Sequence, residues 1–311
     1  MILIIIPAAV IAAMSLASFA GEWVWWLDVL ANFRAQYLVA LALLGVIVVV
    51  SRWRRTGMAI LAVAFLNLLF VAPLYFGSPG KSDPAAPNVR ILSFNLLSSN
   101  ESYNEVVEYI EAVDADLVFL YEASRPWEVA LEAADLDYQI IRGRSDNLIF
   151  GTVVLAREEV ESVSYGFAET QPRAVALDYQ PDGWPVSIKV LSTHPLAPTT
   201  EERASLRDAQ LAFASEWAAE GTGAYFVVGD LNATPWSWPF RNLVADHRLR
   251  NSQIGFGLQP TFSATTLALL RVPIDHLLHS DDLMVRARRL GPRLGSDHFP
   301  LVVDLEYVPH P

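Results

Sequence analysis

Three long stretches without a charged residue constrain this chain more than any other feature. They cover residues 2–20, 35–51 and 56–80. A helix that crosses a bilayer needs about 20 apolar residues, so the first and third stretches are long enough and the second is short but usable. We therefore expect three transmembrane helices at the amino-terminal end of the chain.

A cleaved signal peptide followed by buried core helices is the alternative interpretation. The first stretch lacks a basic start, and two further apolar stretches follow it, so membrane helices are favoured. The composition agrees, because 53% hydrophobic residues and a mean hydropathy of +0.30 exceed the values of ordinary soluble proteins.

Charged and aromatic residues at the ends of these stretches predict the orientation. The loop between the second and third stretches is basic, and basic loops face the cytoplasm. It contains Arg52, Arg54 and Arg55, whereas the preceding loop contains Glu22, Asp28 and Arg34. Tryptophan suits the boundary between water and lipid, and the stretches end near Trp23, Trp25, Trp26 and Trp53. We expect a multi-pass protein of a bacterial cytoplasmic (inner) membrane, with its amino terminus inside and its larger part extracytoplasmic.

A segment rich in Gly, Pro and Ser, GSPGKSDPAAPN, follows the last apolar stretch and predicts a linker. No second segment of this kind interrupts the rest of the chain, so one large domain is the simplest interpretation. We expect a membrane anchor over residues 1–76, a linker over 77–88 and a globular domain over 89–311. The absence of cysteine fits either side of a bacterial membrane.

The part of the chain after Gly80 is acidic. It contains 18 of the 22 basic residues and 32 of the 34 acidic residues, a net charge of −14, which repels nucleic acid unless a local basic patch offsets it. One candidate patch is an arginine cluster, although a solvated loop explains it equally well: Arg286, Arg288, Arg289 and Arg293. Trp236 and Trp238 are candidates for stacking on a base or contacting lipid, with ordinary packing as the alternative.

Runs of Val, Ile and Leu predict the strands of the globular domain. They cover residues 89–95, 116–121, 152–156, 174–179, 186–192, 224–230, 274–280 and 299–307. Helical spacing appears over 103–115 and 199–220, and Thr199 precedes Glu202 in a capping-box pattern. Because strands outnumber helices without strict alternation, we expect an α/β fold in which helices cover a sandwich of mixed sheets.

Polar side chains stand at or just beyond the carboxyl ends of several predicted strands. Taken alone, each acid is more often a cap or a turn residue, and each histidine is more often structural. Their combination indicates phosphoryl chemistry, because Mg²⁺ prefers oxygen ligands such as carboxylates and substrate phosphate. The set comprises Asn95, Glu122, His194, Asp230, Asn232, Asp275, Asp297 and His298.

Two pairs within this set suggest roles from their chemistry alone. In GDLN, the side chains of Asp230 and Asn232 would point the same way if the segment were extended. Asp230 would then take a proton from an attacking water, and Asn232 would orient that water. An Asx turn is the alternative. Asp275 would hold the ring of His298 and raise its pKa, so that a cationic His298 stabilises phosphoryl oxygens or protonates the leaving group. His276 would point to the opposite face and is expected to be structural.

In this order and at these separations, the motifs FN, E, GDLN and SDH resemble those of the exonuclease, endonuclease and phosphatase superfamily. The resemblance covers about residues 89–307 and implies a four-layered α/β sandwich, the deoxyribonuclease-like fold, with the site at one edge of two packed sheets. It implies Mg²⁺ or Mn²⁺ as the cofactor, held mainly by Glu122, with Asn95 and Asp297. Three membrane helices before such a domain resemble a bacterial membrane branch of the superfamily.

The resemblance also implies catalytic roles. Asp230 would activate the water, Asn232 would position the water or the phosphate, and Asp275 would orient His298. His194 and His298 would bind phosphoryl oxygens, and Asn147 is a candidate for substrate binding.

The predicted function is that of a divalent-metal-dependent phosphoesterase, of phosphodiesterase or phosphatase type, in which water attacks an extracytoplasmic phosphate ester. The substrate would be a lipid, a small molecule or a nucleic acid, and the acidic domain favours the first two. Membrane lipid is an expected partner, and no protein partner is predicted. One alternative is a membrane-bound nuclease. Another is a catalytically inactive binding or scaffold protein, against which the complete set of acids and histidines argues.

Overall fold

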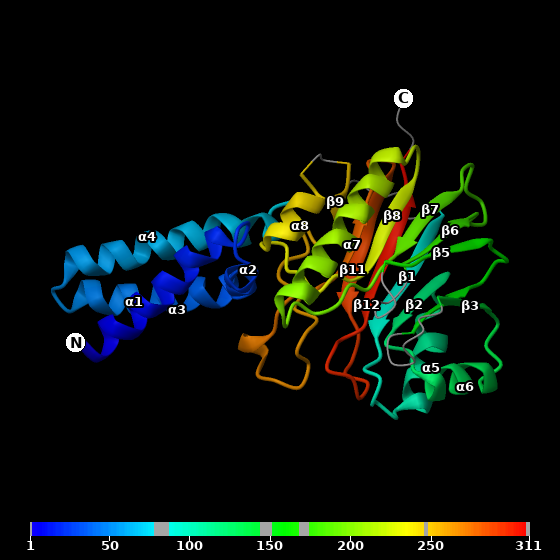
Figure 1. The fold of residues 1–311 in the computed structure, drawn as a ribbon, viewed down its shortest axis with the longest axis horizontal. Coiled ribbons are helices and arrows are strands. Elements are labelled where there is room, and N and C mark those ends of the chain that lie inside the picture. Colours follow the sequence, from blue (N-terminus) through cyan, green and yellow to red (C-terminus); the bar gives the residue numbers. More distant parts are fainter. Residues whose placement is uncertain (1, 78–86, 144–150, 168–173, 246–247, 309–311) are drawn as a thin grey trace.

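The computed structural model describes residues 2–77, 87–143, 151–167, 174–245 and 248–308. Figure 1 shows an elongated molecule, with a bundle of amino-terminal helices at one end and two packed sheets at the other. The linker predicted over 77–88 and Asn147 fall largely or wholly outside these described ranges.

The amino-terminal bundle contains two helices that are long and apolar enough to cross a membrane, Ile2–Ala20 and Arg54–Tyr75. The second predicted stretch lies in the helix Arg34–Val50, which is bent by 62° from the preceding helix Trp25–Ala31. This pair would be a third span only if the two helices cross the membrane as one. The elements are α1 (Ile2–Ala17), η1 (Ser18–Ala20), α2 (Trp25–Ala31), α3 (Arg34–Val50), α4 (Arg54–Val71) and η2 (Ala72–Tyr75).

Two mixed six-stranded sheets form the larger part of the molecule. Their orders are β11-β12-β1-β2-β4-β3 and β5-β6-β7-β8-β10-β9, and only the pairs β1–β2 and β7–β8 within these sheets are parallel. The first sheet comprises β1 (Asn88–Asn95), β2 (Leu117–Tyr121), β3 (Gln139–Gly143), β4 (Thr152–Ala156), β11 (Leu283–Leu290) and β12 (Leu301–Tyr307). The second comprises β5 (Ser162–Tyr165), β6 (Ala174–Tyr179), β7 (Ile188–Ser192), β8 (Tyr225–Asp230), β9 (Arg250–Asn251) and β10 (Asp275–His279).

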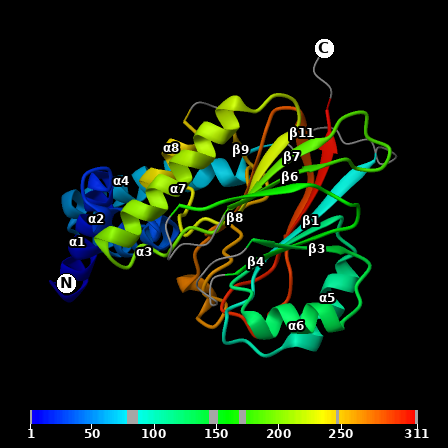
Figure 2. The same ribbon diagram turned by 45° about the vertical axis from the view of Figure 1, so that its right-hand side comes forward.

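Helices cover the outer face of each sheet, which gives four layers (Figures 1 and 2). Between the sheets, Phe119 of β2 packs edge-on against Phe226 of β8. Trp127 belongs to the cluster outside the first sheet, and Phe240 to the cluster outside the second. Because the central strands are buried on both faces, they read as continuous apolar runs. The helices are α5 (Tyr103–Val113) and α6 (Arg125–Ala133) on the first sheet, and α7 (Glu201–Glu220) and α8 (Trp238–Leu243) on the second.

The sandwich predicted from the sequence is confirmed, and all the predicted strands are present. Four further strands were missed: β3, β5, β9 and β11. The capping prediction was wrong in detail, because Thr200 rather than Thr199 accepts the hydrogen bond from Arg203 N, over 3.2 Å. Thr199 instead accepts from the guanidinium of Arg203 over 3.1 Å.

The arginine cluster is not a solvated loop, because most of it forms β11. Arg288 is buried and donates to Ser252 Oγ over 3.2 Å. Arg286 and Arg289 each lie 3.7 Å from an acid of β12, Glu306 and Asp304 respectively. These three arginines therefore contribute to the structure of the first sheet rather than to an open basic patch.

The amino-terminal bundle packs directly on the loop that follows β8. The indole of Trp236 is buried and donates from Nε1 to Phe70 O over 2.9 Å, so packing explains this tryptophan. Thr234 donates from Oγ1 to Asn32 Oδ1 over 3.0 Å. In α2, Asp28 accepts from Trp238 N over 2.6 Å and from Arg207 Nη2 over 3.2 Å.

Candidate active site

Eight of the nine predicted site residues lie in the described part of the chain, and the fold gathers them at one end of the two sheets. Asp230, the last residue of β8, pairs with Asp275, the first residue of β10. In the first sheet, Asn95 pairs with Tyr121, which places Glu122 one residue beyond the pair. Strands from both sheets therefore end at the same site.

Asn95 connects the two sheets through its side-chain amide. Its Nδ2 donates to Glu122 Oε1 and to Asp230 Oδ2, each over 3.0 Å. Its Oδ1 accepts from Leu97 N over 3.0 Å and retains a second lone pair. In this arrangement Asn95 holds two carboxylates near each other.

Glu122 has an unusual backbone conformation. Its φ of 54° lies in the left-handed region, which residues with a side chain rarely adopt and which is enriched at functional sites. The turn directs one carboxylate oxygen to Asn95 and the other to Ser98 N, which donates over 3.2 Å. The side chain remains partly exposed.

Asp230 lies between two histidines. Its Oδ2 is 3.5 Å from His194 Nε2 and 3.6 Å from His298 Nε2. Burial alone would raise the pKa of Asp230, but His298, His194 and the Asn95 hydrogen bond lower it below the ordinary value. For His194, burial lowers the pKa, and the hydrogen bond and charge of Asp230 raise it above the ordinary value.

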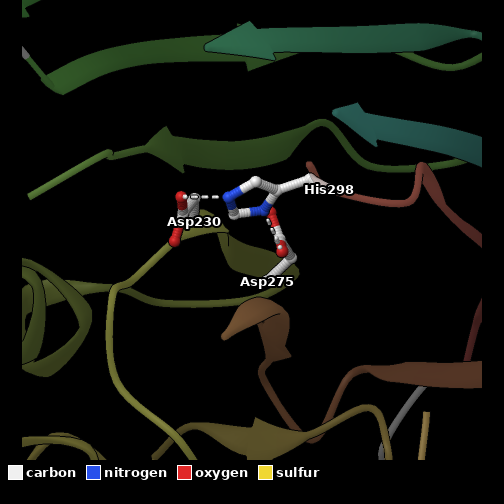
Figure 3. A group of neighbouring side chains, drawn as sticks. All are labelled: Asp230, Asp275 and His298. Carbon is white, nitrogen blue, oxygen red and sulfur yellow. Dashed lines mark hydrogen bonds and ion pairs between the residues drawn. The ribbon is translucent and has the colours of Figure 1, made fainter. Parts of the chain in front are cut away.

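Asp275 fixes His298 through the ring nitrogen that does not face Asp230. Figure 3 shows Asp230 beside one ring nitrogen and Asp275 below the other, and Nδ1 of His298 lies 2.9 Å from Asp275 Oδ2. Burial opposes the charged ring, but Asp275 and Asp230 raise the pKa of His298 to about 10. Burial raises the pKa of Asp275, and His298 offsets only part of this shift.

Asn232 departs from the extended segment that the sequence suggested. Its φ of 48° and the 3.0 Å hydrogen bond from its backbone N to Asp230 Oδ1 form the Asx turn that was the alternative. Its side-chain Nδ2 donates to Pro195 O over 2.9 Å. The turn fixes the orientation of the Asp230 carboxylate.

The chemistry of the residues around Glu122 fits a hard divalent cation. Burial, Glu122 and Asp230 raise the pKa of Asp297, while His298 lowers it. Carboxylates that repel one another in this way are oxygen donors of the type that Mg²⁺ and Mn²⁺ prefer. Glu122 and Asp297 would hold the ion, and Asn95 contacts Glu122 through Nδ2 while its Oδ1 accepts from Leu97 N.

A second group of potential ligands, Asp230, Asp275 and His298, has one donor atom of each within 4.8 Å of the others. A metal ligand must be a neutral imidazole, whereas the two carboxylates keep His298 protonated near neutral pH. Without an ion, this group forms ion pairs around His298, and it is a second candidate metal site.

Three residues that the sequence interpretation missed support this group. Ser296 donates from Oγ to Asn95 O over 2.7 Å and accepts from His298 N over 3.0 Å. Thr261 Oγ1 accepts from Asp275 N over 3.2 Å. The ring of Phe262 packs at 4.9 Å from that of His298. Only Ser296, the first residue of the SDH motif, had a signal in the sequence.

His276 lies on the opposite face of β10, as predicted. It is buried against the ring of Phe240 at 4.6 Å, and its Nε2 lies 2.9 Å from Ala233 O. Burial lowers the pKa of His276 to about 3.

Solved structures share this architecture. The humanized D. rerio TDP2 with 14 mutations has a TM-score of 0.58 and 16% identity, over 70% of this chain and 99% of that one. The endonuclease/exonuclease/phosphatase from Bacteroides vulgatus has a TM-score of 0.59 and 18% identity, over 71% of this chain and 100% of that one. The human Nocturnin catalytic domain with bound sulfate has a TM-score of 0.57 and 18% identity, over 71% of this chain and 94% of that one. At these identities the likeness shows the fold alone.

No curated protein matches the chain. Residues 92–298 match the Endonuclease/Exonuclease/phosphatase family, and this range covers more than half of the 311 residues and contains all eight site residues described above. Members of the family are metal-dependent hydrolases that act on phosphoester bonds. The chain belongs to the Endonuclease/Exonuclease/phosphatase family and is an enzyme of this class.

Proposed function

We propose that the chain is a divalent-metal-dependent phosphoesterase that directs water onto a phosphate ester at the outer face of a bacterial cytoplasmic membrane. One observation carries the proposal: Asp230 faces two histidines, and His298 is held between it and Asp275. The arrangement combines a permanently ionised carboxylate with cationic donors, which is what in-line attack on phosphorus needs.

Asp230 orients the attacking water and receives its proton. Because the pKa of Asp230 is low, it stays ionised but is a weak base, so proton transfer occurs as the water acquires acidity during bond formation. The Asx turn at Asn232 keeps one oxygen of Asp230 occupied and the other directed at the histidines.

His298 and His194 stabilise the charge that develops on the phosphoryl oxygens. The pKa of both is raised, to about 10 for His298, which favours the charged N–H donor in a buried site where such donors act strongly. The Asp275 carboxylate keeps the His298 ring in one orientation. His298 is also placed to protonate the leaving oxygen.

Glu122, Asp297 and Asn95 would hold the metal. When bound, Mg²⁺ or Mn²⁺ supplies a Lewis acid that polarises the phosphoryl group. Asn147, before β4, remains a proposed substrate contact.

The membrane topology is part of the proposal: an anchor over residues 1–76 with three crossings, a linker over 77–88 and the catalytic domain over 89–311. Figure 1 supports it, because the amino terminus and the α3–α4 connection both lie at the end of the bundle away from the sheets. Arg52, Arg54 and Arg55 stand at that connection, and basic loops face the cytoplasm. Apolar side chains such as Leu3, Met58 and Phe65 point outward from the bundle.

The full chain, purified in detergent, tests the activity. We expect it to hydrolyse bis(p-nitrophenyl) phosphate only with added Mg²⁺ or Mn²⁺, and we expect Asp230→Asn to reduce kcat by about 100-fold or more. Asp178→Asn, an exposed substitution on β6, is the matched control. Full activity in chelator, or in Asp230→Asn, would overturn the mechanism.

Nucleic acid is the second class of substrate to test. A D. rerio TDP2 structure of the same fold contains a single-strand DNA product. Against a nuclease stand the net charge of −14 after Gly80 and the engagement of the β11 arginines within the first sheet. Faster cleavage of single-stranded DNA than of any phospholipid would favour the nuclease alternative.

A further inference from the structure

A loop beside the site exposes three leucines to its surroundings. Phe262 and Val272 pair as an isolated bridge and close a loop over residues 263–271. At its tip the exposed fractions are 76% for Leu267, 63% for Leu269 and 53% for Leu270. Clustered exposed apolar side chains mark a contact surface, unlike apolar residues scattered singly. We call residues 267–270 the leucine turn.

The leucine turn is held in one conformation. Leu270 N donates to Leu267 O over 2.8 Å, and Thr266 N donates to Ser263 O over 3.1 Å. Arg271 Nη2 donates to Thr266 O over 3.0 Å, and the guanidinium lies 4.9 Å above the ring of Phe299. A preorganised apolar tip loses little conformational entropy when it enters another phase.

One side of the loop contacts the anchor. Gln36, in the first turn of α3, donates from Nε2 to Arg271 O over 2.9 Å. The leucine turn therefore lies level with the end of the bundle that faces the sheets, and Figures 1 and 2 show this orange segment beside α2 and α3. The exposed indoles of Trp23 and Trp26 precede α3 at the same end.

The other side of the loop contacts the site. Phe262 packs on the ring of His298, and Ala264 N donates to Asp297 O over 2.6 Å. A single short loop thus connects the candidate catalytic residues with the end of the membrane helices.

We propose that the leucine turn inserts into the outer leaflet and that the enzyme hydrolyses the phosphate ester of a membrane lipid. The substrate assignment rests on the proposed function. Water would form a new P–O bond, the ester P–O bond would break, and the lipid alcohol would leave with a proton.

A lipid surface fits the leucine turn better than other occupants do. The bundle, which contacts the loop through Gln36 and Arg271, itself exposes apolar side chains such as Leu43, Phe65 and Leu69. Trp23 and Trp26 mark the level at which amphipathic rings meet lipid headgroups. A nucleic acid would meet the acidic domain and gain nothing from three leucines.

Labelling tests the insertion without using activity. Because the chain has no cysteine, Leu267→Cys creates a single labelling site. An environment-sensitive fluorophore is attached there, and the labelled full chain is placed in a nanodisc. We expect the Leu267 probe to be quenched by spin labels on the lipid acyl chains, and a probe at Val129, 49% exposed on α6 on the far side of the first sheet, to remain unquenched. Equal, weak quenching at both positions would overturn the insertion, whatever the enzyme hydrolyses.

Kinetics test the substrate assignment. Nanodiscs of phosphatidylethanolamine, phosphatidylglycerol and phosphatidic acid offer diesters and a monoester, and bis(p-nitrophenyl) phosphate is the soluble comparison. With Leu267→Asp and Leu269→Asp combined, we expect the ratio of lipid rate to soluble rate to fall by about tenfold or more, because charged side chains would replace the leucines that enter the leaflet. Val129→Asp should leave that ratio unchanged.

The outcomes separate the two proposals. Hydrolysis of the soluble diester with none of the lipids attacked would overturn the lipid assignment and leave the phosphoesterase standing. A quenched Leu267 probe in a chain that hydrolyses nothing would overturn the proposed function while supporting the membrane contact.

Discussion

His298 Nδ1 lies 2.9 Å from Asp275 Oδ2, and both side chains are buried, Asp275 at the start of β10 and His298 in the segment that precedes β12. The pair fixes the protonation state of the imidazole as well as its position. Since the ordinary pKa of histidine is 6.5 and that of His298 is raised to about 10, the ring stays charged through neutral pH.

The first prediction concerns this pair. Asp275→Asn removes the charge that contributes most to raising the pKa of His298, so the alkaline limb of kcat/KM should move to lower pH. The raised pKa of His298 also stabilises the fold. This contribution is fully present below pH 6.5 and is lost as pH rises through about 10, so the Tm of Asp275→Asn should change less over this pH range than that of the wild type. Profiles that coincide with those of wild type would contradict the assignment.

The second prediction concerns the buried ion pair between Asp28 and Arg207. Arg207 Nη1 also donates to Asn232 O over 3.3 Å, so the anchor helps to position the Asx turn. Asp28→Asn removes the buried partner of a buried guanidinium and leaves it only the partly exposed Asp208, so it should cost about 3–5 kcal/mol of stability, and kcat should fall with it.

Asp208 provides the matched control for Asp28→Asn. It pairs with the same guanidinium at 2.8 Å but is partly exposed, so Asp208→Asn should cost only about 0–1 kcal/mol. Thermal unfolding in detergent and single-turnover rates measure both variants. Equal effects of the two substitutions would show that the buried contact has no special role.

The third prediction concerns Gly229, which precedes Asp230 in β8. A Cβ at this position would lie 1.8 Å from Thr193 O, and the obstacle is backbone that cannot swing away. We expect Gly229→Ala to prevent folding or to displace Asp230 with near-complete loss of activity. Gly221→Ala, where the nearest atoms are ring carbons of Tyr225 at 3.0 Å, should be much milder in the same unfolding and activity assays.

The fourth prediction uses the neutral, buried His276. Its pKa of about 3 lies below the ordinary 6.5, so it stabilises the fold above pH 6.5 and loses this contribution as pH falls toward 3. Between pH 6.5 and about pH 5 the wild type should lose about 2 kcal/mol from this group. His276→Gln should show a smaller drop in Tm over the same interval, and an undiminished drop would exclude His276 as the cause.

Much of the fold could be predicted because its central strands are buried on both faces. Strands such as β2 and β8 read as unbroken apolar runs, whereas β11 was missed because Arg286, Arg288 and Arg289 interrupt its pattern. Their charges are neutralised or hydrogen-bonded by partners distant in sequence, such as Asp304 and Ser252. A local pattern does not contain those partners.

The candidate site was predictable where a residue acts through its own functional group. Glu122, Asp230 and His298 were found in this way. Thr261 and Phe262 were missed because one acts through a hydroxyl that accepts from backbone and the other through packing. The turn at Asn232 was left open because a positive φ is a property of the backbone, which the letters GDLN allow but do not require.

The contacts of Trp236 with Phe70 and of Thr234 with Asn32 have a consequence for how this protein can change over evolutionary time. A tether that merely holds an enzyme near a surface can be swapped for any other by gene fusion. Here the loop that follows Asp230 is completed by residues of the amino-terminal bundle, so a substitution on one side of this contact is expected to require a matching one on the other. Recombination at the linker alone would leave Trp236 and Thr234 without these partners.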